Sequence, residues 1–402
     1  MDVGNRLRNR GGAGAGRPLS AIPGGVAPVL AAVGLVIVAF VSVSLLNGTV
    51  PTLPGGGGGG TLHTPTPSNI VITDPRANVP GTLVYAKDGN IWLQVGTKAS
   101  QLTTGGSDSM PAWSADGKWV YFIRSIDRIG RWPVNGGPRP YELSVPYLER
   151  IHPNGTGPAV IVGGTFNRGS FTWSYFIRQP SLSPDGNTAA VISDGPNPTT
   201  SDLVLKFINL KTGAITNPRL LDIGGLGHQD PAWSPDGKSV LYVRDGRDGT
   251  RGAPLIIRYD IATKKSTTLT GAGYIAPAWS PDGRFVAATK TDAFGTDIVI
   301  LDARTGAERL RLTNDTNSFD PVWSPAGDAI AFFRVDRGVV DLELVKLTGA
   351  APDWKVGDTL ALTVAAGLDA SSRPGWFIPA DQLPKPTPSP TPLFPSGPGT
   401  TP

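Results

Sequence analysis

PAWSPDG stands at residues 231–237 and again, unchanged, at residues 277–283. Near-copies read PAWSADG at 111–117, PSLSPDG at 180–186 and PVWSPAG at 321–327. The order Ser-Pro-Asp-Gly fits a type I turn, because its serine can hydrogen-bond to the turn backbone, its proline fixes φ and its glycine accepts a left-handed conformation. Apolar, β-prone runs follow each copy. Each copy of this seven-residue motif, called the phrase below, therefore predicts a strand, a tight turn and a second strand.

The spacing of the phrases indicates how these hairpins are organised. They recur at intervals of 69, 51, 46 and 44 residues, and a period of roughly 40–50 residues is typical of propeller blades. After the phrase at 277–283, β-prone runs continue at 285–289, 297–301 and 308–312, with no amphipathic helix between them. Four short antiparallel strands repeated radially make a propeller.

The two ends of the repeat region complete one another. Residues 82–103 look like a repeat without its first strand, and residues 373–376 (RPGW) look like a first strand without the others. Their pairing would remove the open sheet edges that invite aggregation. We therefore expect an all-β domain at 79–380, a six-bladed β-propeller of four-stranded antiparallel blades closed by its N- and C-terminal strands.

The recurring P-x-W-S-P-D-G phrase, followed by a β-strand, resembles the TolB-type β-propeller repeat over about residues 80–380. Ala115 replaces the proline, Leu182 the tryptophan and Ala326 the aspartate in single copies. The resemblance implies a non-enzymatic module that docks a protein partner and uses no cofactor. Similar propellers also occur in prolyl oligopeptidase-like peptidases and in polysaccharide-active enzymes, so the fold leaves the function open.

We interpret the repeated residues of the phrase as structural. The tryptophans are expected to pack between adjacent blades rather than to form a carbohydrate platform, and the aspartates are explained by the turns rather than by catalysis. The residues concerned are Trp113, Asp116, Gly117, Asp185, Gly186, Trp233, Asp236, Gly237, Trp279, Asp282, Gly283, Trp323 and Gly327.

The N-terminal region predicts a membrane anchor. An uncharged apolar run at 26–46 is long enough, at about 1.5 Å per residue, to cross a bilayer core of about 30 Å. Four arginines precede it, so the positive-inside rule places residues 1–20 in the cytoplasm and the propeller outside. We predict an uncleaved single-pass helix at 21–47. The alternative is a cleaved signal peptide, which has a shorter apolar region.

Composition limits the remaining possibilities. The Gly/Pro/Thr-rich residues 48–78 are expected to be a linker, and the Pro-rich residues 381–402 a disordered tail.

The net charge is +4, of which the first twenty residues carry +3, and this balance argues against a nucleic-acid partner. The chain has no cysteine, which excludes disulfides, thiolate metal sites and a lipoprotein anchor.

The longest interval between phrases contains an insertion at 124–178 that is rich in arginine and aromatic residues, the types enriched at interface hot spots. The alternative is that the aromatics cap the propeller or extend blade strands and that the arginines are solvated. His228, just before the third phrase, is expected to face the channel or the ring surface. The candidate binding residues are Arg128, Arg131, Trp132, Arg139, Tyr141, Tyr147, Trp173, Tyr175 and His228.

Three functions remain open at this point. The first is a membrane-anchored, extracytoplasmic docking module for a protein partner. The second is binding of a cell-envelope polysaccharide, and the third is a hydrolase or lyase with a channel site around His228. The chain has no G-x-S-x-G elbow, and its isolated histidines do not predict a metal site. An enzyme would require convergent polar side chains with strongly shifted pKa values in the channel.

Overall fold

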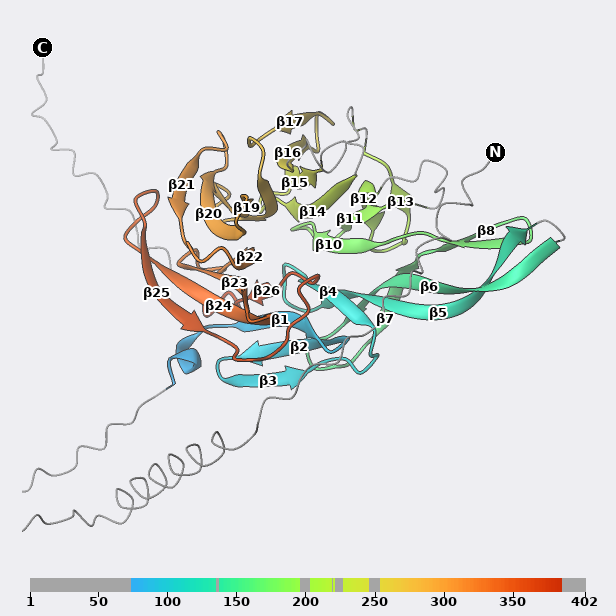
Figure 1. Cartoon of the computed structure of the whole chain (residues 1–402), viewed down its shortest axis with the longest axis horizontal. Helices are drawn as coiled ribbons and strands as arrows, with labels where there is room; N and C mark the ends of the chain where they lie inside the picture. Colours follow the sequence, from blue (N-terminus) through green and yellow to red (C-terminus); the bar gives the residue numbers. More distant parts are fainter. Residues whose placement is uncertain are drawn as a thin grey trace, which may run out of the picture. The chain divides into compact units, whose positions relative to one another are not determined.

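The computed structural model describes residues 74–384 apart from 135–136, 196–202, 219, 221–226 and 246–253. In this part the chain forms one short 3-10 helix, η1 (Pro75–Asn78), and six antiparallel sheets of four strands arranged as a ring (Figure 1). The predicted six-bladed propeller is confirmed. The predicted anchor at 21–47 lies outside the described residues, within which no helix has the length and apolar character needed to cross a membrane.

The first three blades are each built from the inner strand outward. Blade 1 is made of β26 (Gly375–Phe377), β1 (Thr82–Lys87), β2 (Asn90–Val95) and β3 (Lys98–Gln101). Blade 2 is made of β4 (Asp108–Trp113), β5 (Val120–Val134), β6 (Gly137–Ile151) and β7 (Ala159–Gly163). Blade 3 is made of β10 (Arg178–Leu182), β11 (Thr188–Ser193), β12 (Val204–Asn209) and β13 (Ile215–Thr216).

The other three blades repeat this order. Blade 4 is made of β14 (His228–Trp233), β15 (Ser239–Arg244), β16 (Leu255–Asp260) and β17 (Ser266–Thr268). Blade 5 is made of β18 (Tyr274–Trp279), β19 (Phe285–Thr291), β20 (Thr296–Asp302) and β21 (Glu308–Arg311). Blade 6 is made of β22 (Ser318–Trp323), β23 (Ala329–Asp336), β24 (Val339–Thr348) and β25 (Lys355–Ala361).

The ring closes through the two ends of the domain, as the sequence predicts. β26 pairs antiparallel with β1, with Leu83 opposite Trp376. The indole Nε1 of Trp376 also donates to the carbonyl oxygen of Pro80 at 2.9 Å. The two terminal segments of the propeller therefore share one sheet. β26 is the inner strand of blade 1, and its pairing covers an edge of β1 that would otherwise be open.

The phrase turns have the predicted conformation. In blade 4 the N–H of Gly237 donates to the carbonyl oxygen of Ser234 at 2.9 Å, and Gly237 has a left-handed φ of 71°. The hydroxyl of Ser234 accepts from the N–H of Ser239 at 2.9 Å and donates to Oδ1 of Asp236 at 2.7 Å. Serine and aspartate thus hold the turn together, which supports reading these carboxylates as structural.

The hydrophobic core consists of six clusters, one between each pair of adjacent blades. Side chains alternate along a strand, so β15 sends Val240 and Tyr242 toward blade 3 and Leu241 and Val243 toward blade 5. The same alternation recurs in the second strand of every blade. Because both faces of a blade pack against neighbouring blades, the residues of the second strand that lie in these clusters are apolar on both faces.

The predicted insertion forms a long hairpin, called the arm below. β5 and β6 have 15 residues each and pair over their whole length, so they extend well beyond blade 2 (Figure 1). A second hairpin, made of β8 (Thr165–Arg168) and β9 (Phe171–Ser174), lies beside them. The structure therefore favours the alternative in which the insertion extends blade strands.

Candidate functional site

A ring of side chains surrounds the propeller axis at the position just before each phrase proline. In five blades this residue interrupts the register of the inner strand and has a left-handed φ between 50° and 53°. Such a bulge turns the residue out of the regular pleat. The five residues are Met110, Gln179, Asp230, Ala276 and Asp320, and Arg373 precedes the corresponding proline of blade 1.

These residues link successive blades by hydrogen bonds. The N–H of Asp230 donates to Oε1 of Gln179 at 3.1 Å, and the N–H of Ala276 donates to Oδ2 of Asp230 at 3.0 Å. Ala276 has no side-chain acceptor for the next blade. The N–H of Asp320 donates instead to the hydroxyl of Thr289, at 3.0 Å. Each bulge therefore uses a side chain of the preceding blade to satisfy its backbone donor.

Two aspartates and one arginine form the charged part of this ring. Asp230 is 6% exposed, and its Oδ1 accepts from Nε2 of Gln179 at 2.7 Å. Nη2 of Arg373 donates to the carbonyl oxygen of Pro277 at 2.8 Å, which places a residue of blade 1 against blade 5. Burial raises the pKa of Asp230, and burial together with the charge of Asp230 raises the pKa of Asp320 to about 7. The charge of Arg373 opposes both shifts.

Asp320→Asn should make the free energy of unfolding less dependent on pH between about 4 and 7. An acid whose pKa is raised by folding stabilises the folded state at low pH, and this contribution is lost as pH rises from 3.8, its usual pKa, to about 7. We expect the wild type to lose about 1–2 kcal/mol more than the variant over this range, since Asp320 is only partly buried. Urea denaturation at several pH values measures the difference. Parallel pH profiles would contradict the raised pKa.

The cavity beside these groups is small. It is lined by Met110, Gln179, Pro231 and Arg373, and its volume of about 30 Å³ has room for water, but neither Asp230 nor Asp320 is among its lining residues. The raised pKa values of the two aspartates meet one requirement for catalysis in the channel. The side-chain hydrogen bonds of Asp230 are explained by the contacts between blades.

His228 does not face the channel, contrary to expectation. It is 3% exposed, its Nδ1 accepts from the N–H of Leu205 at 3.2 Å, and its ring centre lies 4.6 Å from that of Tyr242. The bulge at Asp230 reorients the strand only after His228, whose side chain stays between blades 3 and 4. Among the described residues, no group of three or more His, Asp or Glu side chains is arranged to hold a metal ion.

A funnel of about 480 Å³ opens where the phrases of all six blades converge. Its wall is mainly apolar, and Trp113, Trp233 and Trp279 are partly exposed in it. The same indoles also pack between blades, as Trp233 does against Phe207 at 5.7 Å between ring centres. The lining includes Pro111, Pro180, Pro231, Pro277, Pro321, Pro374, Trp113, Trp233, Trp279, Trp323 and Trp376.

The predicted binding residues of the insertion are distributed along the arm. Arg128, Arg131 and Arg139 are exposed, and the guanidinium of Arg128 lies 5.4 Å from the ring centre of Tyr147. The side chain of Trp132 lies outside the described residues.

The other predicted aromatics make contacts within and around the β8–β9 hairpin, and Tyr141 joins this hairpin to the arm. Tyr141 donates its hydroxyl to the carbonyl oxygen of Thr172, and Tyr175, only 4% exposed, donates to that of Gly163, both at 2.9 Å. Trp173 stacks on Phe166, with 6.3 Å between ring centres. These aromatics therefore have a structural role in addition to any binding.

Known proteins share this architecture. Residues 163–354 match the family model described as the TolB beta propeller domain. The fold is similar to that of TolB from Acinetobacter baumannii, with a TM-score of 0.52 and 18% identity over 74% of this chain and 66% of that one. A putative TolB from Agrobacterium tumefaciens gives a TM-score of 0.50 and 20% identity over 73% of this chain and 92% of that one.

A chain of a nidogen/laminin complex also gives a TM-score of 0.50, with 12% identity over 73% of this chain and 97% of that one. At such identities the likeness to solved structures shows the fold alone. The curated proteins contain no match to the chain.

Proposed function

Since residues 163–354 of this chain match the TolB β-propeller domain, we propose that the protein is a non-enzymatic docking module for a protein partner. The observation that carries this proposal is the apolar funnel at the convergence of the six phrases. The buried core of a protein–protein interface is enriched in aromatic residues and depleted of charged ones, and the funnel has this composition. The funnel wall consists of inner strands and of the turns that follow them, and both are held by hydrogen bonds within the propeller, so the site would need little ordering when the partner binds.

The arm provides a second surface for the same partner. It presents Arg128, Arg131 and Arg139 to solvent on a paired hairpin. Arginine combines a charged fork with a flat surface and is enriched in interface hot spots. A partner that filled the funnel with an apolar segment and carried acidic residues beside it would use both surfaces.

The proposal includes the location of the domain. Residues 21–47 would cross the cytoplasmic membrane, residues 1–20 would remain in the cytoplasm, and the linker at 48–78 would hold the propeller outside. Four arginines before the apolar run and no charged residue between that run and Asp74 support this orientation. A cell-envelope polysaccharide is the alternative ligand, because the partly exposed indoles of the funnel could stack on sugar rings.

Ala115→Arg should reduce capture of the partner by about tenfold or more, because interface hot spots cost about 2 kcal/mol or more when disrupted. Ala115 is exposed at the funnel wall, so a long charged side chain would enter the apolar space without disturbing the core. Thr97→Arg adds the same side chain at an exposed position between β2 and β3 and should have no effect. Crosslinking in the native envelope and quantification of the captured proteins measure both variants.

Three results would count against protein docking through the funnel. Ala115→Arg would capture as much protein as Thr97→Arg, or the crosslinked material would contain no protein enriched over background. Enrichment of envelope glycan fragments instead, with a shift in tryptophan fluorescence, would support the polysaccharide alternative.

A further inference from the structure

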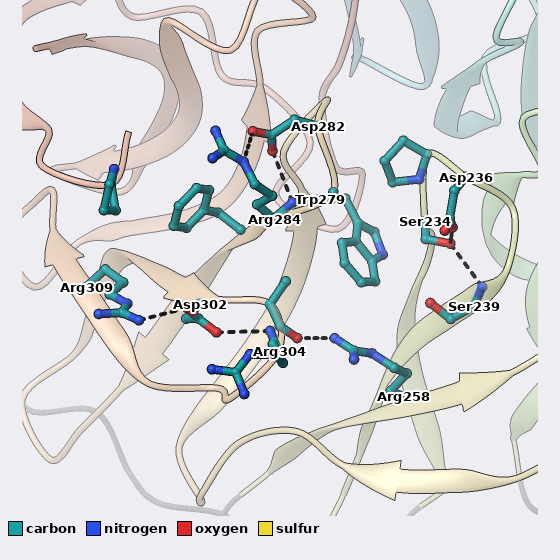
Figure 2. A pocket seen from close by; sticks show the side chains of 15 residues that line it. Ser234, Asp236, Ser239, Arg258, Trp279, Asp282, Arg284, Asp302, Arg304 and Arg309 are labelled. Atoms are coloured by element: carbon teal, nitrogen blue, oxygen red, sulfur yellow. Dashed lines mark hydrogen bonds and ion pairs between the residues drawn. The ribbon is translucent and has the colours of Figure 1, made fainter. Parts of the chain in front are cut away.

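A pocket of about 580 Å³ lies between blades 4 and 5 (Figure 2). This volume is within the range of small-molecule sites, roughly 300–1,000 Å³. Trp279 and Phe285 contribute aromatic surface to its lining. Its charged residues are four arginines and three aspartates, namely Arg258, Arg284, Arg304, Arg309, Asp236, Asp282 and Asp302.

All three carboxylates are already paired with a cation. The nitrogen–oxygen distances are 2.6 Å for Arg284–Asp282, 2.8 Å for Arg309–Asp302 and 3.8 Å for Lys238–Asp236. In the described part of the chain no carboxylate forms an ion pair with Arg258 or Arg304. The pocket therefore contains two guanidinium groups that form no ion pair within the described residues, although the charge of Asp236 acts on Arg258 and favours its protonated form.

Arg258 is held in place although it has no carboxylate partner. It extends from β16, donates from Nη2 to the carbonyl oxygen of Ala303 and lies 5.4 Å from the ring centre of Trp279. Its Nε is buried and makes no hydrogen bond within the described residues. Burial lowers its pKa, but a guanidinium remains charged. A buried charge with an unused donor is costly unless a ligand or water completes it.

Arg304 belongs to the same edge of the pocket because it follows Ala303 directly. It lies in the turn between β20 and β21, where its backbone N–H donates to Oδ1 of Asp302 at 3.1 Å. Its side chain is exposed, and Figure 2 shows it beside Arg258. The hydrogen bond between Arg258 and Ala303 thus brings Arg258 of blade 4 against the backbone of blade 5 directly beside Arg304.

We propose that this pocket binds a phosphomonoester. Two guanidinium groups without an ion pair can both face a phosphomonoester, which carries about −1.5 to −2 at neutral pH. Their planar forks also suit the bidentate geometry of phosphate oxygens. A phosphodiester or a single carboxylate carries only one negative charge and would interact more weakly with the pair. The proposal is independent of the docking role of the funnel.

Arg304→Gln should weaken binding of phenyl phosphate to the full-length chain by about tenfold or more, since charged hydrogen bonds contribute about 1.5–3 kcal/mol. Lys98→Gln removes the same charge from an exposed position on blade 1, and we expect affinity to stay within about twofold of the wild type, because exposed charges beyond a Debye length are largely screened. Methyl phenyl phosphate, a monoanionic diester, should bind the wild type about tenfold more weakly than the monoester. Isothermal titration calorimetry measures all four affinities.

Three outcomes would overturn the proposal. The wild type would fail to bind phenyl phosphate at millimolar concentration, the diester would bind as tightly as the monoester, or Arg304→Gln would behave like Lys98→Gln. Because Arg304 is exposed and forms no side-chain contact that supports the fold in the described residues, its loss should not unfold the protein. Thermal unfolding of both variants verifies this.

Discussion

Gly81→Ala should lower the free energy of unfolding by about 3–4 kcal/mol, the range of the most disruptive single substitutions. Gly81 directly precedes β1 and has a left-handed φ of 75°. A Cβ there would lie 2.2 Å from the carbonyl oxygen of Phe377 and 2.7 Å from Cγ1 of Ile378. Relief of this clash would have to move β26, which pairs with β1 through three residues. The substitution therefore acts on the closure of the ring.

Gly106→Ala is the matched control, because Gly106 has a φ of 74° and a Cβ there would have nothing within 4 Å. Gly106→Ala should lower the free energy of unfolding only by the cost of a left-handed backbone at alanine, about 1–2 kcal/mol. Urea denaturation of the two variants and the wild type isolates the contribution of ring closure. Equal losses would show that the contact of Gly81 with Phe377 and Ile378 does not limit the stability of the closed ring.

Asp230→Ala should lower the free energy of unfolding by about 3 kcal/mol, because it leaves buried hydrogen-bond donors without an acceptor. The donors are the side-chain amide of Gln179 and the backbone N–H of Ala276, and the variant would also remove a negative charge close to Arg373. Asp230→Asn keeps one oxygen acceptor, so its loss should be smaller.

Asp127→Ala, at an exposed position of the arm, provides the baseline and should change stability by less than about 0.5 kcal/mol. Chemical denaturation at neutral pH compares the three variants. If Asp230→Ala were as stable as Asp127→Ala, the hydrogen bonds between blades would not contribute to holding the ring together.

The sequence is sufficient to predict the propeller because its decisive information is local and repeated. Ser234, Asp236 and Gly237 specify a turn by their own hydrogen bonds and backbone preference, and the same combination recurs around the ring. The closing strand could be identified because Pro374 and Trp376 retain part of the phrase. The count of six blades depends on that degenerate copy.

The channel could not be predicted, because its residues occupy the variable position of the repeat. Met110, Gln179, Ala276 and Asp320 have four different side chains, and a residue before proline usually has an extended backbone. Their left-handed bulges arise from the tertiary packing of the inner strands. His228 stands three residues before the phrase proline, and this position alone did not predict that its side chain would lie between blades.

The pocket between blades 4 and 5 also lacked a local signal. Arg258 and Arg304 belong to different blades and become neighbours only when those blades pack. In the insertion, composition pointed to an exposed surface, whereas Tyr141 and Tyr175 are held by hydrogen bonds that shape the arm. Arginine and aromatic content alone does not separate binding residues from residues that support a hairpin.

Site-specific photo-crosslinking from the funnel is the most direct test of the docking function. A benzophenone amino acid at Ala115 would sit at the funnel wall, and the same group at Thr97 would sit on an exposed turn of blade 1. After irradiation of intact cells, we expect a discrete protein adduct from position 115 that is absent from position 97. The absence of a protein adduct from position 115, or the same adducts from both positions, would contradict a partner bound in the funnel.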